Sequence, residues 1–162
     1  MDPLSLTASL IAVIETSGQI ISCCYKYQSG VRHAAKDAKK ISTEVTGLLG
    51  TLQRLLSIAQ DEEERQTARL PTLQALAQPD GLLTECQTEL TSLIAKVKPK
   101  TGWDKIQSSL VWPLQKGEVK EALDRIHRIT NGLNLALTTE NTWVQTTVPV
   151  TKQVLDTNCV GL

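Results

Sequence analysis

The first part of the chain carries small and apolar residues at helical spacing and almost no charge. Between Pro3 and Tyr25 the only charged side chain is Glu15. Asp2 is suited to cap a helix whose first position is Pro3. The apolar stripe consists of Leu6, Leu10, Val13, Ile14, Ser17, Ile21 and Cys24. Glu15 falls on the opposite, weakly polar face. We therefore predict a long first helix with one apolar face.

Three further stretches show the same periodicity. A second stripe runs from Ala38 to Ala59, a third from Leu82 to Val97, and a fourth from Val119 to Leu137. The back of the second helix is basic, with Arg32, Lys36, Lys39 and Lys40. We expect its helix to end at the acidic run 61–64, which is typical of a solvated loop.

The connections between these stripes contain turn and breaker residues. Residues 65–81 are predicted to be a connection with one short helix near 72–77, ending in the turn Pro79-Asp80-Gly81. Residues 103–110 predict another short helix, broken by the missing amide of Pro113. Trp112 is then expected to mark a structural corner and to pack as an anchor rather than serve as a binding aromatic.

The resulting prediction is an all-α fold, an antiparallel four-helix-type bundle over residues 1–140. After Glu140 the periodicity fades and Pro149 is expected to interrupt the helix, so 141–162 is predicted to be a weakly helical tail or final helix. The central residues of each stripe should share one core: Leu10, Ile14, Leu48, Leu52, Leu90, Leu93, Ile126 and Leu133.

Composition narrows the function classes. The 162 residues fit one domain, and the absence of phenylalanine with only five Trp and Tyr residues suits helices better than a β-sandwich. Lys plus Arg and Asp plus Glu both number 17, so the chain lacks the basic excess of a dedicated nucleic-acid binder. The acidic start Met1-Asp2-Pro3 is unlike a secretory signal, and the four cysteines form no disulfide framework. A reduced, cytoplasmic setting fits best.

The sequence offers no catalytic constellation. His33 and His127 lack ligands at metal-binding spacing, and no glycine-rich phosphate loop is present. The neighbouring Cys23 and Cys24 are expected to be small, partly buried residues, with S-acylation as the alternative if the first helix meets a membrane. We expect no enzyme activity, no metal and no cofactor.

Two stretches resemble one family. The opening MDPLSLTASLIAVI is similar to the start of the fungal HeLo-like domains, which are N-terminal domains of fungal STAND (NOD-like) receptors and related cell-death proteins. The segment LVWPLQKGEV at 110–119, followed by a long helical pattern, resembles the family's L-x-WP-x-x-K-x-E-V segment. The two stretches bracket most of residues 1–140. The chain departs from the family in its tail, where Pro149 and a Thr-rich run replace an expected charged helix.

The resemblance implies a helical bundle that acts in programmed cell death of the heterokaryon-incompatibility type. After activation and oligomerisation, the N-terminal helix would be released and would insert into the plasma membrane. The implied partners are anionic phospholipid, further copies of the domain, and an upstream STAND receptor or a C-terminal regulatory region. On this basis the membrane-inserting residues are Leu6, Leu10, Val13, Ile14, Glu15 and Ile21, and the lipid head-group patch is Arg32, Lys36, Lys39 and Lys40.

A second hypothesis remains open from the residues themselves. About 20 apolar residues span a bilayer, but Glu15 and the many Ser and Thr residues make the first helix a poor permanent span. An amphipathic stripe of this kind equally fits the core of a soluble bundle. The alternative function is therefore a helical adaptor that binds other proteins, or itself, without touching lipid.

Overall fold

The computed structural model describes residues 3–30, 35–65, 71–98 and 112–159, with side chains for 6–29, 36–61, 73–98 and 112–139. Most of these residues lie in five helices, and no strand occurs in the described ranges. The helices are α1 (Pro3–Gly30), α2 (Ala35–Arg65), α3 (Pro71–Leu76), α4 (Leu82–Val97) and α5 (Lys116–Cys159). The predicted all-α class is confirmed.

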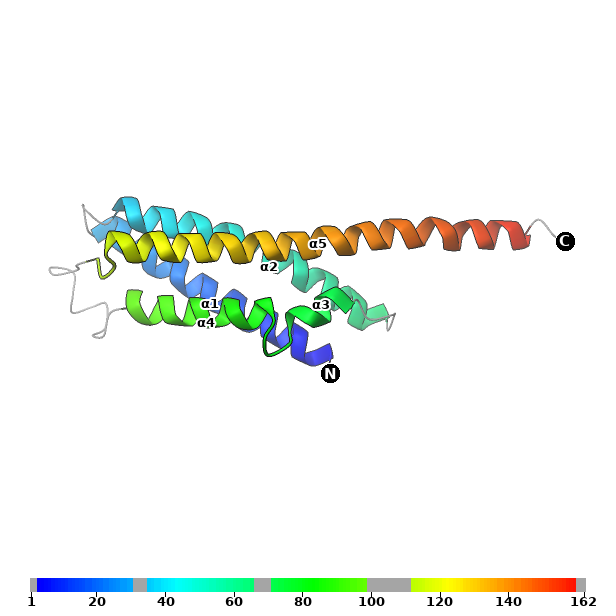
Figure 1. The fold of residues 1–162 in the computed structure, drawn as a ribbon, viewed down its shortest axis with the longest axis horizontal. Coiled ribbons are helices and arrows are strands. Elements are labelled where there is room, and N and C mark those ends of the chain that lie inside the picture. Colours follow the sequence, from blue (N-terminus) through cyan, green and yellow to red (C-terminus); the bar gives the residue numbers. More distant parts are fainter. Residues whose placement is uncertain (1–2, 31–34, 66–70, 99–111, 160–162) are drawn as a thin grey trace.

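The four long helices form a bundle in which each consecutive pair runs in opposite directions (Figure 1). α1 packs against α2 and α4, and α5 packs against the same two helices from the other side. The short α3 lies at one end, in contact with α1, α4 and α5. α1 and α5 therefore occupy opposite corners of the bundle, and α2 and α4 separate them.

The core lies where the four stripes meet. Of the eight residues predicted to share it, seven are buried, and Ile14 is half-buried and packed against the others. The prediction of one common core is confirmed. Burial of a leucine or isoleucine side chain contributes about 1.5–3 kcal/mol, so these positions carry much of the stability of the bundle.

The buried face of α1 differs from the predicted stripe in its second half. Its buried residues are Leu10, Val13, Ser17, Ile20, Cys23, Cys24 and Tyr27. Ile20 and Tyr27 were outside the predicted stripe, whereas Ile21 is only half-buried. The buried hydroxyl of Ser17 donates to the carbonyl of Val13 at 2.8 Å, which removes the cost of burying it.

Residues 112–115 form a non-helical corner before α5, as predicted. The backbone amide of Gln115 donates to the Glu118 carboxylate at 3.0 Å, so an acidic side chain caps the start of the helix. The predicted short helix at 103–110 lies outside the described residues. The predicted helix near 72–77 is found as α3, and the turn at Gly81 follows it.

Two predicted interruptions are wrong. α2 continues through the acidic run at 61–64 to Arg65, because glutamate is a good helix former. α5 continues through Pro149 to Cys159 and extends beyond the other helices (Figure 1). A proline removes one backbone hydrogen bond from a helix, and the turns on both sides keep theirs.

Candidate functional site

α1 contains a stretch long and apolar enough to cross a membrane. This stretch, Leu6–Ser29, has a mean hydropathy of 1.4, and 28% of its apolar window is buried inside the bundle. Core helices of soluble proteins and signal sequences have the same length and composition. Length and composition therefore do not distinguish α1 from such helices, and the burial and charge of its two faces have to be compared.

The structure places the predicted membrane-inserting residues on both faces of α1. Leu10 and Val13 are buried in the core, and Leu6, Ile14 and Ile21 are partly buried against it. Glu15 is exposed on the opposite face, as expected. The apolar stripe is therefore occupied by protein contacts in this state, and the carboxylate is in water.

The exposed face of α1 is almost uncharged. Its members are Ala8, Ile11, Ala12, Glu15, Gly18, Gln19, Ser22, Tyr25, Lys26 and Ser29. Ile11 is 42% exposed and Tyr25 is 68% exposed. The exposed face of α5, by contrast, carries charges from Lys116 to Arg128, including Lys120 and Asp124. The outer face of α1 is therefore easier to dehydrate than the lysine-bearing face of α2 or the first turns of α5. The exposed face of α4, which is mainly Thr and Ser, is similarly poor in charge.

The contacts between α1 and α4 combine apolar packing with a few polar groups. The hydroxyl of Tyr27 donates to the carbonyl of Val97 at 2.8 Å. The side-chain amide of Gln87 makes a long contact of 3.5 Å with the hydroxyl of Thr16. Its oxygen is buried and has no hydrogen-bond partner among the described residues. An unpaired buried acceptor costs about 1–3 kcal/mol, so this interface is not optimised for maximum stability.

Trp112 packs at the end of α1, as predicted. Its ring meets Tyr27 edge-on, with ring centroids 5.1 Å apart and planes at 87°. The indole Nε1 is buried and has no hydrogen-bond partner among the described residues. Trp112 therefore anchors the corner at 112–115 by packing against the Tyr27 ring, as expected of a structural residue rather than of a ligand-binding aromatic.

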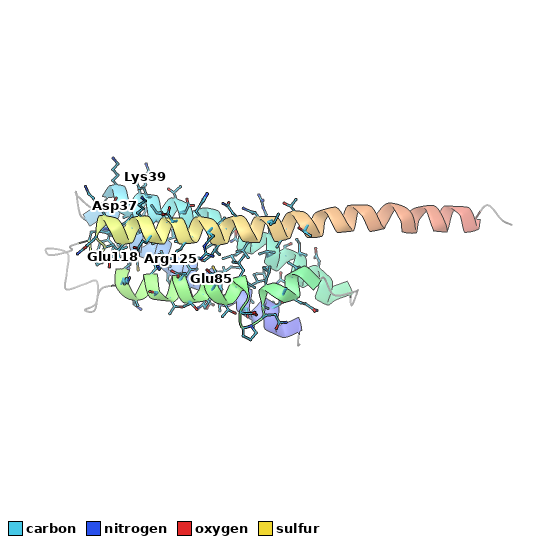
Figure 2. The ribbon with its side chains drawn as sticks, in the orientation of Figure 1. Asp37, Lys39, Glu85, Glu118 and Arg125 are labelled. Carbon is cyan, nitrogen blue, oxygen red and sulfur yellow. The ribbon has the colours of Figure 1, made fainter. Side chains whose placement is uncertain are left out.

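Charged contacts join α5 to α4. Arg125 pairs with Glu89 at 3.3 Å, and Arg128 pairs with Glu85. Figure 2 shows Arg125 and Glu85 in the region between these two helices. The sequence analysis did not identify these pairs, because each joins residues more than 30 positions apart in sequence and depends on which helix faces meet.

Polar contacts also join α5 to α2. The ring nitrogen Nδ1 of His127 lies 2.8 Å from the Glu44 carboxylate. About two turns further along, the hydroxyl of Thr51 donates to the side-chain oxygen of Asn134 at 3.1 Å. α5 is thus tied to both of its main neighbours through polar groups that a hydrocarbon environment could not replace.

The basic patch lies in the first turns of α2. Lys36, Lys39 and Lys40 are all exposed, and Figure 2 shows Lys39 pointing outward from this end of the helix. Arg32 lies outside the described residues. The three lysines line one wall of an open groove of about 470 Å³ between α2 and α5. The other wall comes from Leu123, Asp124 and His127, which the sequence analysis did not connect with the patch.

The described cysteines are buried thiols. Cys23 and Cys24 of α1 and Cys86 of α4 are free and lie in the core. Burial raises the pKa of the Cys86 thiol to about 12, and the nearby carboxylates of Glu85 and Glu89 add to the shift. The core interpretation of Cys23 and Cys24 is confirmed for this state, in which neither thiol is accessible for S-acylation.

Two features therefore stand out: the nearly uncharged outer face of α1 and the lysine-lined groove between α2 and α5. Among the described residues, no group of three His, Cys, Asp or Glu side chains is placed to hold a metal ion. No family model matches the chain, and no curated protein or solved structure matches it either.

Proposed function

We propose that the protein is a membrane-targeting effector or signalling domain of fungal regulated cell death, of the heterokaryon-incompatibility type. In this proposal the domain rests in the cytoplasm as a closed bundle. After self-association it exposes α1, which inserts into the anionic plasma membrane. The observation that carries the proposal is the outer face of α1, which is nearly free of charge along a helix long enough to span a bilayer.

Insertion requires both faces of α1 to tolerate lipid. The face that is now in the core carries residues such as Leu10 and Ile20. Lipid acyl chains would cover the apolar surface of these residues as well as the protein core does. The outer face consists mainly of small or weakly polar side chains. The main obstacle is Glu15, because a charged carboxylate at the bilayer centre costs about 2.5–3.5 kcal/mol.

The pattern of contacts also fits the departure of one helix. α1 occupies a corner of the bundle and packs mainly on α2 and α4. α2, α4 and α5 are joined to one another through the polar contacts of α5, which do not involve α1. Release of α1 would therefore leave a three-helix unit held by α5, with a new apolar surface available for self-association.

The partners follow from this mechanism. Anionic phospholipid would meet the basic patch of Lys36, Lys39 and Lys40, which lies near the end of α1 from which α2 departs. Further copies of the domain would cover the surface that α1 leaves. An upstream STAND receptor or a C-terminal regulatory region would supply the trigger.

The alternative is a helical adaptor that recruits proteins without touching lipid. The observation that favours it is α5, which extends beyond the bundle and exposes Leu135 to 68% near the point where the packed part ends (Figure 1). An exposed helix face of this kind is suited to helix-in-groove recognition. In that case α1 would be a permanent part of the core.

Vesicle leakage distinguishes the two functions. Removing α1 altogether would also remove Leu10, Val13 and Ile20 from the core, so substitutions on the outer face make a cleaner test. We expect the double variant Glu15→Lys and Ser22→Lys to fold normally, since both positions are exposed. Glu15→Lys keeps a charge of similar cost at that position, and Ser22→Lys adds about 2.5–3.5 kcal/mol to the cost of insertion, so dye release from anionic vesicles should fall sharply.

The matched control is Ser57→Lys with Asp61→Lys, two exposed positions of α2 that change the net charge by the same amount. This control should bind anionic vesicles as strongly as the α1 variant and should still release dye. Equal leakage from both variants would overturn the inserted-helix mechanism and leave the adaptor function in its place.

A further inference from the structure

The groove between α2 and α5 is an open depression lined by charged side chains from both helices. It has a volume of about 470 Å³, within the range of small-molecule sites. Its lining combines three lysines from α2 with a histidine from α5 and the aliphatic side chain of Leu123. Basic groups from two different helices therefore converge on one space.

We propose that this groove binds a phosphate monoester and that the His127–Glu44 pair makes its affinity proton-dependent. The ligand is either a lipid head group or a soluble phosphate. The proposal rests on the proposed function, because it names the ligand class of the basic surface that would meet the membrane.

The charges in the groove favour a compact dianion. The ionisable groups that line it are Lys36, Lys39, Lys40 and Glu44 from α2, and Asp124 and His127 from α5. Three ammonium groups against two carboxylates leave an excess positive charge even when the imidazole is neutral. The groove also lies at the N-terminal end of α2, where the helix dipole attracts anions.

Hydrogen bonding within the groove decides which groups are left for a ligand. The hydroxyl of Thr43 donates to the backbone carbonyl of Lys39 at 2.8 Å, so it is not available as a donor. The available donors are the lysine ammonium groups and the second ring nitrogen of His127. Ammonium groups act as point charges that suit phosphate oxygens, and a phosphate monoester offers three such oxygens.

The His127–Glu44 pair controls the electrostatic balance of the groove. Nδ1 of His127 lies 2.8 Å from the Glu44 carboxylate, and the ring is 66% exposed. Protonation adds a positive charge beside the three lysines and offsets Glu44, so acidification should strengthen anion binding by the groove.

The test uses the full chain and three probes. Two are phosphatidylcholine vesicles that contain either phosphatidic acid, a phosphate monoester, or phosphatidylserine at the same surface charge. The third is inorganic phosphate, followed by NMR shifts of the α2 amides and of the His127 ring. We expect tighter binding to phosphatidic acid than to phosphatidylserine, with a loss of about fivefold for each of Lys36, Lys39 and Lys40 replaced by Gln.

The control for charge is the triple replacement of Lys96, Lys98 and Lys120 by Gln, since these lysines are exposed and lie outside the groove. The proton dependence is measured as the ratio of two affinities for the same ligand, that of the wild type and that of His127→Gln. Protonation of the ligand affects both proteins equally and therefore cancels in this ratio. This ratio should rise as the pH falls, because a protonated imidazole adds positive charge to the groove.

The outcomes separate the site from the proposed function. Shifts at the groove with inorganic phosphate but no vesicle binding would support a soluble phosphate ligand and contradict the membrane function. Vesicle leakage with equal binding of both anionic lipids, and equal losses in the two lysine triples, would overturn the phosphate site while leaving the membrane function intact. A pH-independent ratio would overturn the role of His127.

Discussion

Glu15 is the residue on which the proposed mechanism depends most directly. It is the only acidic side chain of α1, and it lies in water on a face whose other described members are uncharged except for Lys26. In the closed bundle its charge has almost no energetic consequence, whereas in a bilayer it is the largest single penalty. A residue with such different costs in two environments is suited to set the balance between them.

Replacing Glu15 by Gln should therefore separate stability from membrane activity. We expect the free energy of unfolding in urea to change by less than about 0.5 kcal/mol, because the position is exposed and the substitution nearly isosteric. Dye release from anionic vesicles should increase, since the cost of burying the carboxylate is removed. Asp61→Asn, at an exposed site of α2, is the charge-matched control and should leave release unchanged. Unaltered release from Glu15→Gln would argue against insertion of this face.

At the scale of elements, α1 differs from α5 in how it is attached. α5 pairs with α4 through two arginines and with α2 through His127 and Asn134. α1 depends chiefly on apolar contacts, supplemented by the Tyr27 hydrogen bond to Val97 and by the Trp112 ring against Tyr27. Lipid can replace apolar contacts but not directional polar ones, so α1 is the element that a membrane could draw away.

The Tyr27 hydroxyl provides a test of this attachment. Tyr27→Phe removes the hydrogen bond to the Val97 carbonyl and leaves that acceptor buried. We expect a loss of about 0.5–1.5 kcal/mol in unfolding free energy and faster amide exchange in the last turns of α1. Tyr25→Phe is the matched control, because the Tyr25 ring is 68% exposed. Equal exchange in both variants would mean that this hydrogen bond does not hold α1 to α4.

At the scale of the whole molecule, the fold buries ionisable thiols that it must keep neutral. The pKa of Cys86 is raised from 9.0 to about 12 by burial, with the Glu85 and Glu89 charges adding to the effect. A thiol whose pKa is higher in the folded than in the unfolded state makes its full contribution to stability below the pKa of the unfolded state. That contribution is lost as the pH rises from the unfolded pKa towards the folded pKa. Above the unfolded pKa the unfolded chain releases a proton that the folded chain retains, so stability falls as the pH rises.

Cys86 should consequently contribute to loss of stability in alkali. We expect the difference in unfolding free energy between the wild type and Cys86→Ala to shrink between pH 9.0 and about pH 12, by at most about 1.4 kcal/mol per pH unit. Chemical denaturation at a series of pH values measures it. Below pH 9.0 the difference should be constant, and in that range the variant should be the less stable protein because it leaves a small cavity. A difference that stays constant across the alkaline range would show that Cys86 is not protected from ionisation.

Helical periodicity and composition are sufficient to predict the class of the fold and the position of most core residues. Helical periodicity places Leu48, Leu90 and Ile126 in the interior wherever the partner helices lie, since a stripe of apolar side chains must be buried in some way. The composition of α1 and the exposure of Glu15 follow from the same local pattern. These properties need no knowledge of which helix packs against which.

Only the tertiary structure decided the features that depend on pairing. Ile20 and Tyr27 are buried because α2 and α4 both pack against α1, and the arc of α1 that they cover is set by their crossing, which periodicity alone does not specify. The approach of His127 to Glu44 likewise requires α5 to lie beside α2 in one register. The lysine patch could be predicted from the sequence. The groove could not, because its second wall is formed by residues of α5 that pack beside α2. Local pattern fixes which face of a helix is apolar, whereas sites form where faces distant in sequence meet.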